Sequence, residues 1–289
     1  MTPSCAGWLL ANFDFDQAEG LRRLLAGPRP RSFTFLSVTS DQEKSATMVN
    51  LGATLARSGK EVLLIDARSK YRGISADLEL PYCVTLMDVA REKRILNEAL
   101  RPMPQGFSVA LMRHENRHDI EACHDSKIMR HLGATFDLLA RQTDILLIDG
   151  ELNADGSFLV PALGNGEIVI QVAPGAVAIQ EAYALVKRLN AQLGRRSFGI
   201  LVTGASEQEA QVVYDNMARA ANRYLAVQLK SLGSVPADEH LRRARRLGRS
   251  VVEAFPLAGA SIAFRRLAGR VVGMEAVSER HGLQAAGAN

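Results

Sequence analysis

The stretch that decides the fold runs from Phe33 to Ala67 and reads FTFLSVTSDQEKSATMVNLGATLARSGKEVLLIDA. It opens with an apolar run, Phe33 to Val38, that contains no glycine or proline and predicts a buried strand. From Ser45 onward apolar residues recur at helical spacing, which predicts a helix. A second apolar run, Glu61 to Ile65, predicts another buried strand and leads to Asp66. The order strand, turn, helix, strand, with an acid after the second strand, is the usual opening of a nucleotide-binding sheet.

The turn between the first strand and the helix contains the residues for phosphate chemistry. Lys44-Ser45 opens the predicted helix, as the Lys-[Ser/Thr] pair of a P-loop does. A P-loop needs several glycines because its backbone N–H groups must converge on a phosphate. Here Asp41, Gln42 and Glu43 precede the lysine, so glycine is absent and two carboxylates lie where an anion would bind. We therefore expect the architecture of a P-loop with impaired phosphate binding.

The alternation of strands and helices continues through the chain. The run DILLID, Asp144 to Asp149, is a very apolar strand that ends in an acid, which is the Walker B pattern of a Mg²⁺-holding carboxylate. Further strands are predicted at residues 106–112, 167–172, 198–202 and 229–235, and helices at residues 81–101, 126–142, 179–193 and 206–224. This order predicts a doubly wound, mostly parallel α/β sheet of the P-loop NTPase type. Residues 31–258 are expected to form one domain, with residues 1–30 and 259–289 as attached segments.

Composition narrows the class of protein. The chain has 289 residues, of which 47% are hydrophobic, so it can bury a substantial core. Its net charge of +4 is mildly basic, which allows nucleic acid or an anionic membrane as a partner without requiring either. Three cysteines give no paired framework, and no apolar run is long enough to span a membrane. We expect a cytoplasmic protein.

The N-terminal segment contains one amphipathic stretch, Asp14 to Leu25, before the chain breaks at Gly27-Pro28-Arg29-Pro30. Asp16 and Glu19 have the spacing of a helix capping box, and an apolar face is formed by Ala18, Leu21 and Leu25. Two readings remain open. The segment either docks on its own domain or binds a partner protein.

The C-terminal segment, Ala260 to Met274, has a second amphipathic pattern. An apolar face is bordered by arginines, which suits a helix at an anionic membrane surface. The other reading is a last helix that packs on the sheet, and periodicity alone favours it. The residues of the proposed membrane-facing surface are Phe264, Leu267, Val271, Arg265 and Arg266.

Several blocks of the chain resemble the MinD/ParA-like regulators of flagellar number and placement, the FlhG/FleN type, over nearly its whole length. DQAEGLR at 16–22 is similar to the N-terminal DQAxxLR motif that distinguishes this branch from division-site MinD proteins. The runs at 60–67, 143–150, 173–189 and 250–268 look like that family's blocks in the same order. The matches at 16–22 and 250–268 are the most specific.

The resemblance implies ATP and Mg²⁺ as ligands and an ATP-dependent homodimer. By carry-over, the nucleotide-binding residues would be Lys44, Ser45, Asp66 and Asp149, with Mg²⁺ held through Ser45 and Asp149 only if nucleotide binds. The DQAxxLR helix in this family binds the signal-recognition-type GTPase FlhF and stimulates its GTP hydrolysis. The partner-binding residues here would be Asp16, Gln17, Ala18, Leu21 and Arg22. The resemblance also implies flagellar switch or C-ring proteins, or a flagellar transcriptional activator, as partners.

Four departures from the family pattern fall on nucleotide chemistry. The family loop reads like SGKGGVGKT, whereas SDQEKS at 40–45 is three residues shorter and lacks its first lysine. Arg68 replaces the second acid of Asp-x-Asp, and Gly150-Glu151-Leu152 replaces a small switch motif. Thr203-Gly204 lies where the family has an adenine-contacting asparagine. Because phosphoryl transfer depends on positioned groups, we expect impaired hydrolysis and weak or absent ATP binding.

Three hypotheses follow. The first is a regulator of flagellar number, placement and assembly that acts through protein contacts with little or no ATPase activity. The alternative is a working MinD-type ATPase that cycles between a cytosolic monomer and a membrane-bound ATP dimer, at the inner face of the membrane or at the cell pole. A DNA-binding ParA relative would use the arginines at 242–246, but four arginines on one helix are more often a solvated surface.

Overall fold

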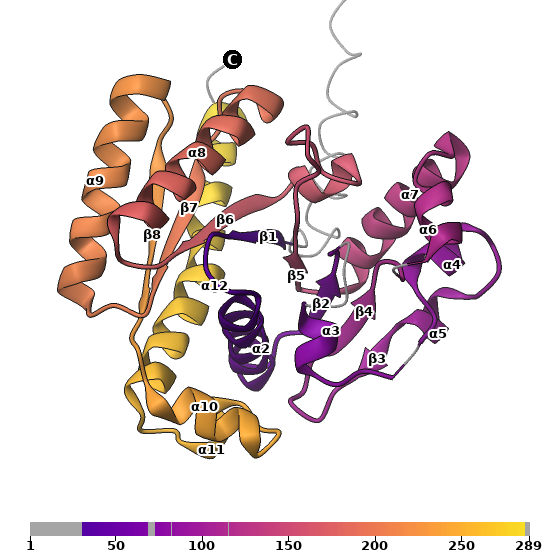
Figure 1. Ribbon diagram of the computed structural model, residues 1–289, viewed down its shortest axis with the longest axis horizontal. Helices are drawn as coiled ribbons and strands as arrows, with labels where there is room; N and C mark the ends of the chain where they lie inside the picture. The colour runs from indigo at the N-terminus through magenta and orange to yellow at the C-terminus, as the bar shows by residue number, and fades with distance from the viewer. Residues whose placement is uncertain (1–30, 69–72, 82, 115, 287–289) are drawn as a thin grey trace, which may run out of the picture.

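The computed structural model of the chain describes residues 31–68, 73–81, 83–114 and 116–286, with side chains as far as Gly273 except that of Arg117. Its strands are β1 (Arg31–Ser37), β2 (Val62–Asp66), β3 (Arg101–Pro102), β4 (Ser108–Leu111), β5 (Ile145–Asp149), β6 (Glu167–Val172), β7 (Phe198–Thr203) and β8 (Leu229–Val235). They form one sheet in the order β3-β4-β2-β5-β1-β6-β7-β8. All neighbours are parallel except the edge pair β3 and β4, which confirms the predicted doubly wound sheet (Figure 1).

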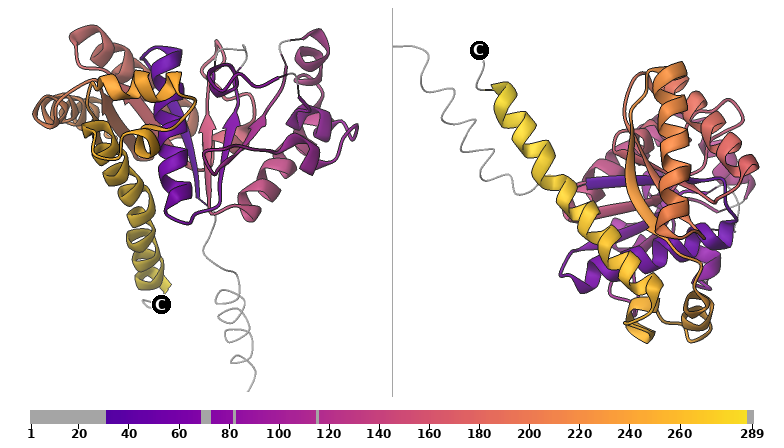
Figure 2. Two further views of the ribbon diagram at one scale, coloured as in Figure 1. Left: turned by 90° about the horizontal axis from the view of Figure 1, so that it is seen from below. Right: turned by 90° about the vertical axis from the view of Figure 1, so that its left-hand side faces the viewer.

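Helices cover both faces of the sheet (Figures 1 and 2). They are α2 (Asp41–Arg57), α3 (Ile74–Asp77), α4 (Leu86–Ala90), α5 (Leu96–Ala99), α6 (Arg117–Ala122), α7 (Ser126–Gln142), α8 (Ala176–Leu193), α9 (Glu207–Leu225), α10 (Glu239–Arg246), α11 (Val251–Ala254) and α12 (Gly259–Ala286). Side chains alternate between the two faces along each strand. In β1, for example, Leu36 packs with α7 and α8 in one core layer, while Phe33 and Phe35 pack with α2 and α12 in the other.

The helix predicted over residues 81–101 is not continuous. It is replaced by the short helices α4 and α5 and by strand β3. The break follows α4, where Glu92 has a left-handed φ of 60° that no helix interior accepts. The N–H of Met87, in the first turn of α4, donates to the carbonyl of Met112, which ties the start of α4 to the end of β4. The left-handed residue at 92 ends the helix after one and a half turns.

Helix α12 belongs to the folded domain. Its residues Phe264, Leu267 and Val271 are each at most 2% exposed and join the core layer that contains α2. The helix lies along α2 and the edge strand β8, and its last turns extend beyond the sheet (Figure 2). Within the described residues, no helix is long and apolar enough to cross a membrane.

Candidate functional site

The candidate nucleotide site lies at the carboxyl edge of the central strands, where the topology brings together all four residues predicted for it. Asp66 and Asp149 are register partners at the ends of β2 and β5. Lys44 and Ser45 lie in the first turns of α2, which follows β1, and both side chains are buried. The convergence was predictable because ligands of open parallel sheets bind at the carboxyl ends of the strands.

Helix α2 begins earlier than the sequence pattern predicts. It starts at Asp41, three residues before Lys44, and its N-cap is Ser40. The N–H of Glu43 donates to the Ser40 hydroxyl at 3.2 Å, and the N–H of Lys44 donates to the Ser40 carbonyl at 3.1 Å. These two N–H groups are therefore used within the helix and are not available to a phosphate. The prediction that the helix opens at Lys44-Ser45 is wrong because the residues before Lys44 themselves form a capped helical turn.

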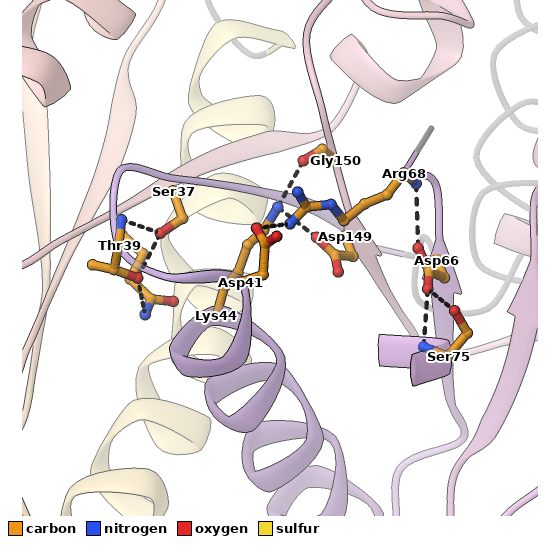
Figure 3. A network of polar contacts seen from close by, with 10 residues as sticks. Ser37, Thr39, Asp41, Lys44, Asp66, Arg68, Ser75, Asp149 and Gly150 are labelled. Atoms are coloured by element: carbon orange, nitrogen blue, oxygen red, sulfur yellow. Dashed lines mark hydrogen bonds and ion pairs between the residues drawn. The ribbon is translucent and has the colours of Figure 1, made fainter. Parts of the chain in front are cut away.

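The two carboxylates at this helix start are each bound by another side chain of the chain. The Arg68 guanidinium donates to Asp41 at 2.5 Å (Figure 3). The Thr203 hydroxyl donates to the Glu43 carboxylate, also at 2.5 Å. Acids in a first helical turn are favoured by the helix dipole, and here they fill the place in which a P-loop would hold phosphate oxygens.

Lys44 is turned away from solvent toward strand β5. Its ammonium forms an ion pair with Asp149 and donates to the Gly150 carbonyl at 2.7 Å (Figure 3). The side chains of Lys44 and Asp149 are 4% and 0% exposed, so the ion pair is shielded from solvent. A charge in such surroundings needs its partner, because an unpaired buried ion carries a large desolvation cost.

Three of the four departures from the family pattern thus contact the fourth, the shortened loop. Asp41 of the shortened loop pairs with Arg68, which replaces an acid. Glu43 of the loop pairs with Thr203, which replaces the asparagine. Lys44 bonds to Gly150 of the altered switch. Sequence reasoning identified each departure separately but not these pairings. A signal was present, since Asp41 and Arg68 are opposite charge changes within one predicted site.

The Asp66 carboxylate lies close to that of Asp149. It accepts bonds from the N–H and the hydroxyl of Ser75, at 2.9 and 2.5 Å (Figure 3). Burial and the nearby Asp149 charge nevertheless raise the pKa of Asp66 above its ordinary value. An acid with a raised pKa in the folded state makes the protein less stable as pH rises from the unfolded pKa, 3.8, through the folded one. The Asp149 charge thus disfavours the ionised form of Asp66, and a bound cation would relieve this effect.

These donors fit a divalent cation. The Ser45 hydroxyl and the Asp149 carboxylate are buried and have no hydrogen-bond partner within the described residues, although Lys44 is ion-paired to Asp149. The backbone of Gly73 lies close to the carboxylates of Asp66 and Asp149, because a Cβ there would lie 2.7 Å from an oxygen of each. Mg²⁺ prefers oxygen ligands of this kind. If Mg²⁺ binds, Ser45 and Asp149 would hold it.

The same site does not fit the phosphates of a nucleotide. Two carboxylates lie at the helix start, and the N–H groups of Glu43 and Lys44 are bonded to Ser40. The lysine that would neutralise phosphate is paired with Asp149. A cavity of about 540 Å³ lies beside the site, between α2 and α10, with Phe264 in its lining. Glu43 and Thr203, bonded to each other, form part of its wall.

The other predicted site residues fall in two groups. Residues 16–22, expected to bind a partner, lie outside the described part of the chain. The apolar residues expected to face a membrane, Phe264, Leu267 and Val271, lie in the core instead, while Arg265 and Arg266 are exposed. The correction has a simple cause, since packing on α2 buries this apolar face within the same chain. Membrane contact by these three side chains would require α12 to leave the domain.

The chain is similar to known proteins in both sequence and fold. No protein-family model matches the chain. It is 30% identical over 237 residues to the antiactivator FleN of Pseudomonas aeruginosa, which covers 79% of this chain and 81% of that protein. Its fold resembles the cell-division ATPase MinD of Pyrococcus furiosus, with a TM-score of 0.66, 20% identity and coverage of 85% and 99%. MinD of Pyrococcus horikoshii, solved with Mg-ADP, has a TM-score of 0.65 at 20% identity, covering 85% and 98%.

Proposed function

The chain belongs to the FlhG/FleN-like branch of the MinD/ParA family, and from this premise we propose that it regulates flagellar number or assembly by binding partner proteins, without an ATP cycle. The relative at 30% identity is named an antiactivator, which describes action on another protein. One observation above all supports a mode of action without an ATP cycle. The charged side chains Asp41 and Lys44 at the start of α2 are already paired within the chain, Asp41 with Arg68 and Lys44 with Asp149.

An ATP cycle needs a site that changes between nucleotide states. In a MinD-type cycle the loop lysine would exchange solvent or a side chain for phosphate. Here the exchange would separate a buried ion pair, bring phosphate next to two carboxylates and release two N–H groups from Ser40. Each step costs free energy. The function then depends on surfaces of the fold rather than on hydrolysis.

The partner that we propose is a GTPase of the FlhF type, contacted through Asp16, Gln17, Ala18, Leu21 and Arg22. A flagellar switch protein or transcriptional activator is a second partner of the same regulatory role. The alternative, a working ATPase that binds the membrane as a dimer, has one observation in its favour. The Ser45 hydroxyl and the Asp149 carboxylate fit Mg²⁺, as described above.

Titration with a fluorescent ATP analogue and Mg²⁺, combined with size-exclusion chromatography, tests the proposal. We expect no saturable binding up to millimolar nucleotide and no nucleotide-dependent change in elution. A matched variant in which residues 40–45 read SGKGGVGKT restores the glycines and should bind at least about ten-fold more tightly, since the N–H groups can then converge on phosphate. Micromolar binding by the natural chain with a shift to a dimer would establish the ATPase alternative.

The partner surface has a separate test. Replacing Gln17 and Leu21 by alanine is expected to abolish stimulation of an FlhF-type GTPase, because both belong to the DQAxxLR match and Leu21 is the central residue of the apolar face. Arg23→Ala, just outside the DQAxxLR match, is the matched control and should keep the stimulation. GTP hydrolysis is measured at fixed GTPase and increasing amounts of each variant. Unchanged stimulation by the Gln17/Leu21 variant would assign the contact elsewhere.

A further inference from the structure

An open apolar groove of about 530 Å³ lies between the C-terminal end of α2 and α12, away from the candidate nucleotide site. Its lining includes Val252, Ala268, Gly269 and Val272. A Cβ on Gly269 would have no atom within 4 Å, so the groove is empty at that point. An exposed apolar hollow on a folded domain is a candidate for covering by another segment.

Three basic side chains, Arg57, Lys60 and Arg265, line the same groove. Arg265 donates to the Pro256 carbonyl at 2.8 Å. Among the described residues, no carboxylate forms an ion pair with any of the three. A groove of this kind suits an occupant with an apolar face and acidic side chains.

The chain enters the described structure beside this groove. The Arg31 guanidinium, at the start of β1, donates to the Val271 carbonyl at 2.7 Å, and Val272 lines the groove. Thirty residues precede Arg31. The five residues 26–30 can span up to about 17 Å when extended, so the segment before them reaches the groove without strain.

The sequence of that segment offers the groove an apolar face and an acidic first residue. Ala18, Leu21 and Leu25 share one face at helical spacing, and Asp14, Asp16 and Glu19 are acidic. At about 100° per residue, Asp14 falls on the same side as the apolar face, whereas Asp16, Glu19 and Arg23 fall on the other side. We propose that residues 14–25 dock in the groove between α2 and α12, with their apolar face on Val252, Ala268 and Val272 and Asp14 toward the basic side chains.

Docking would have a regulatory consequence, which rests on the proposed partner function. The leucine face that would enter the groove is the face that a partner GTPase would bind. One segment cannot bury the same side chains in two places, so docking and partner binding would exclude each other. The groove would then hold the partner-binding segment until a partner competes for it.

Hydrogen exchange of the full-length protein tests the docking itself, without any partner. We expect the amides of residues 17–25 to exchange at least about ten-fold more slowly in the natural chain than in Gly269→Phe, whose ring would fill the groove. Gly133→Phe is the matched control. Gly133 also lies in a helix, α7, with no atom within 4 Å of its Cβ, but it is not in the groove. It should leave the exchange unchanged.

A charge-reversal pair provides a second, independent test. Arg57→Glu with Lys60→Glu should speed the exchange of the segment, and adding Asp14→Lys should restore the slow exchange. Equal exchange in the natural chain and Gly269→Phe, or failure of the charge reversal to have any effect, would overturn the proposal. Protection that disappears on dilution would overturn it too, because the occupant would then be a second copy. Neither result depends on nucleotide binding, so failure here is separable from failure of the proposed function.

Discussion

Replacing Lys44 by alanine is expected to lower the free energy of unfolding of the nucleotide-free protein by about 3–5 kcal/mol, the range for breaking a buried ion pair by removing one partner. The variant would leave Asp149, which is 0% exposed, without its counter-ion and beside a second carboxylate, Asp66. It would also leave the Gly150 carbonyl without its donor. Urea denaturation followed by circular dichroism measures the loss.

Two further variants identify the cause. Lys187→Ala removes an exposed lysine of α8 and should change stability by no more than about 0.5 kcal/mol. The double variant Lys44→Met/Asp149→Leu replaces the pair by apolar side chains of similar size and should be more stable than Lys44→Ala. If Lys44→Ala keeps the stability of the natural chain, the lysine does not stabilise the nucleotide-free fold. It would then be able to leave Asp149 and bind phosphate, and the ATPase alternative would gain support.

Replacing Phe264 by alanine is the second change with a large expected effect, a loss of about 3–5 kcal/mol. The Phe264 side chain is 1% exposed and lies in the core layer with α2, so its removal leaves a cavity next to the one beside the nucleotide site. Thermal and urea denaturation measure the effect. Ile262→Ala, on the same helix but at a 42% exposed position, is the matched control and should cost much less.

The Phe264 variant also distinguishes the two readings of α12. A helix that rests in the domain loses stability when Phe264 is truncated. A helix that lies on a membrane with this face loses binding to anionic vesicles while the soluble protein keeps its stability. Unchanged unfolding of Phe264→Ala together with lost vesicle binding would contradict the packed arrangement.

Much of the fold was predictable because local patterns and topology rules act together. Apolar runs without glycine or proline predicted β1, β2 and β5, and the parallel order followed from the helices between them. Once these strands are parallel, Lys44, Asp66 and Asp149 must meet at one edge of the sheet. One exception was the region of α4 and α5, where a left-handed backbone at Glu92 ends a helix that periodicity alone would extend.

The sequence by itself therefore determined the class of fold, the edge at which the site forms and the residues that meet there. The family branch followed from quoted motifs and from the 30% identical relative. The sequence also showed that glycines were missing from the loop at 40–45. It did not determine the partners of the residues that replaced them.

Tertiary structure alone decided which charges pair and which faces are buried. Asp41 and Arg68 are far apart in sequence, and Glu43 and Thr203 farther still, so only the assembled sheet brings each pair within hydrogen-bond distance. For α12, periodicity identified Phe264, Leu267 and Val271 as one apolar face but not what covers it. Membrane, partner and core remove apolar surface from water by the same effect, so the pattern is the same for all three. Only the position of α2 beside α12 decides that in this fold the cover is the core.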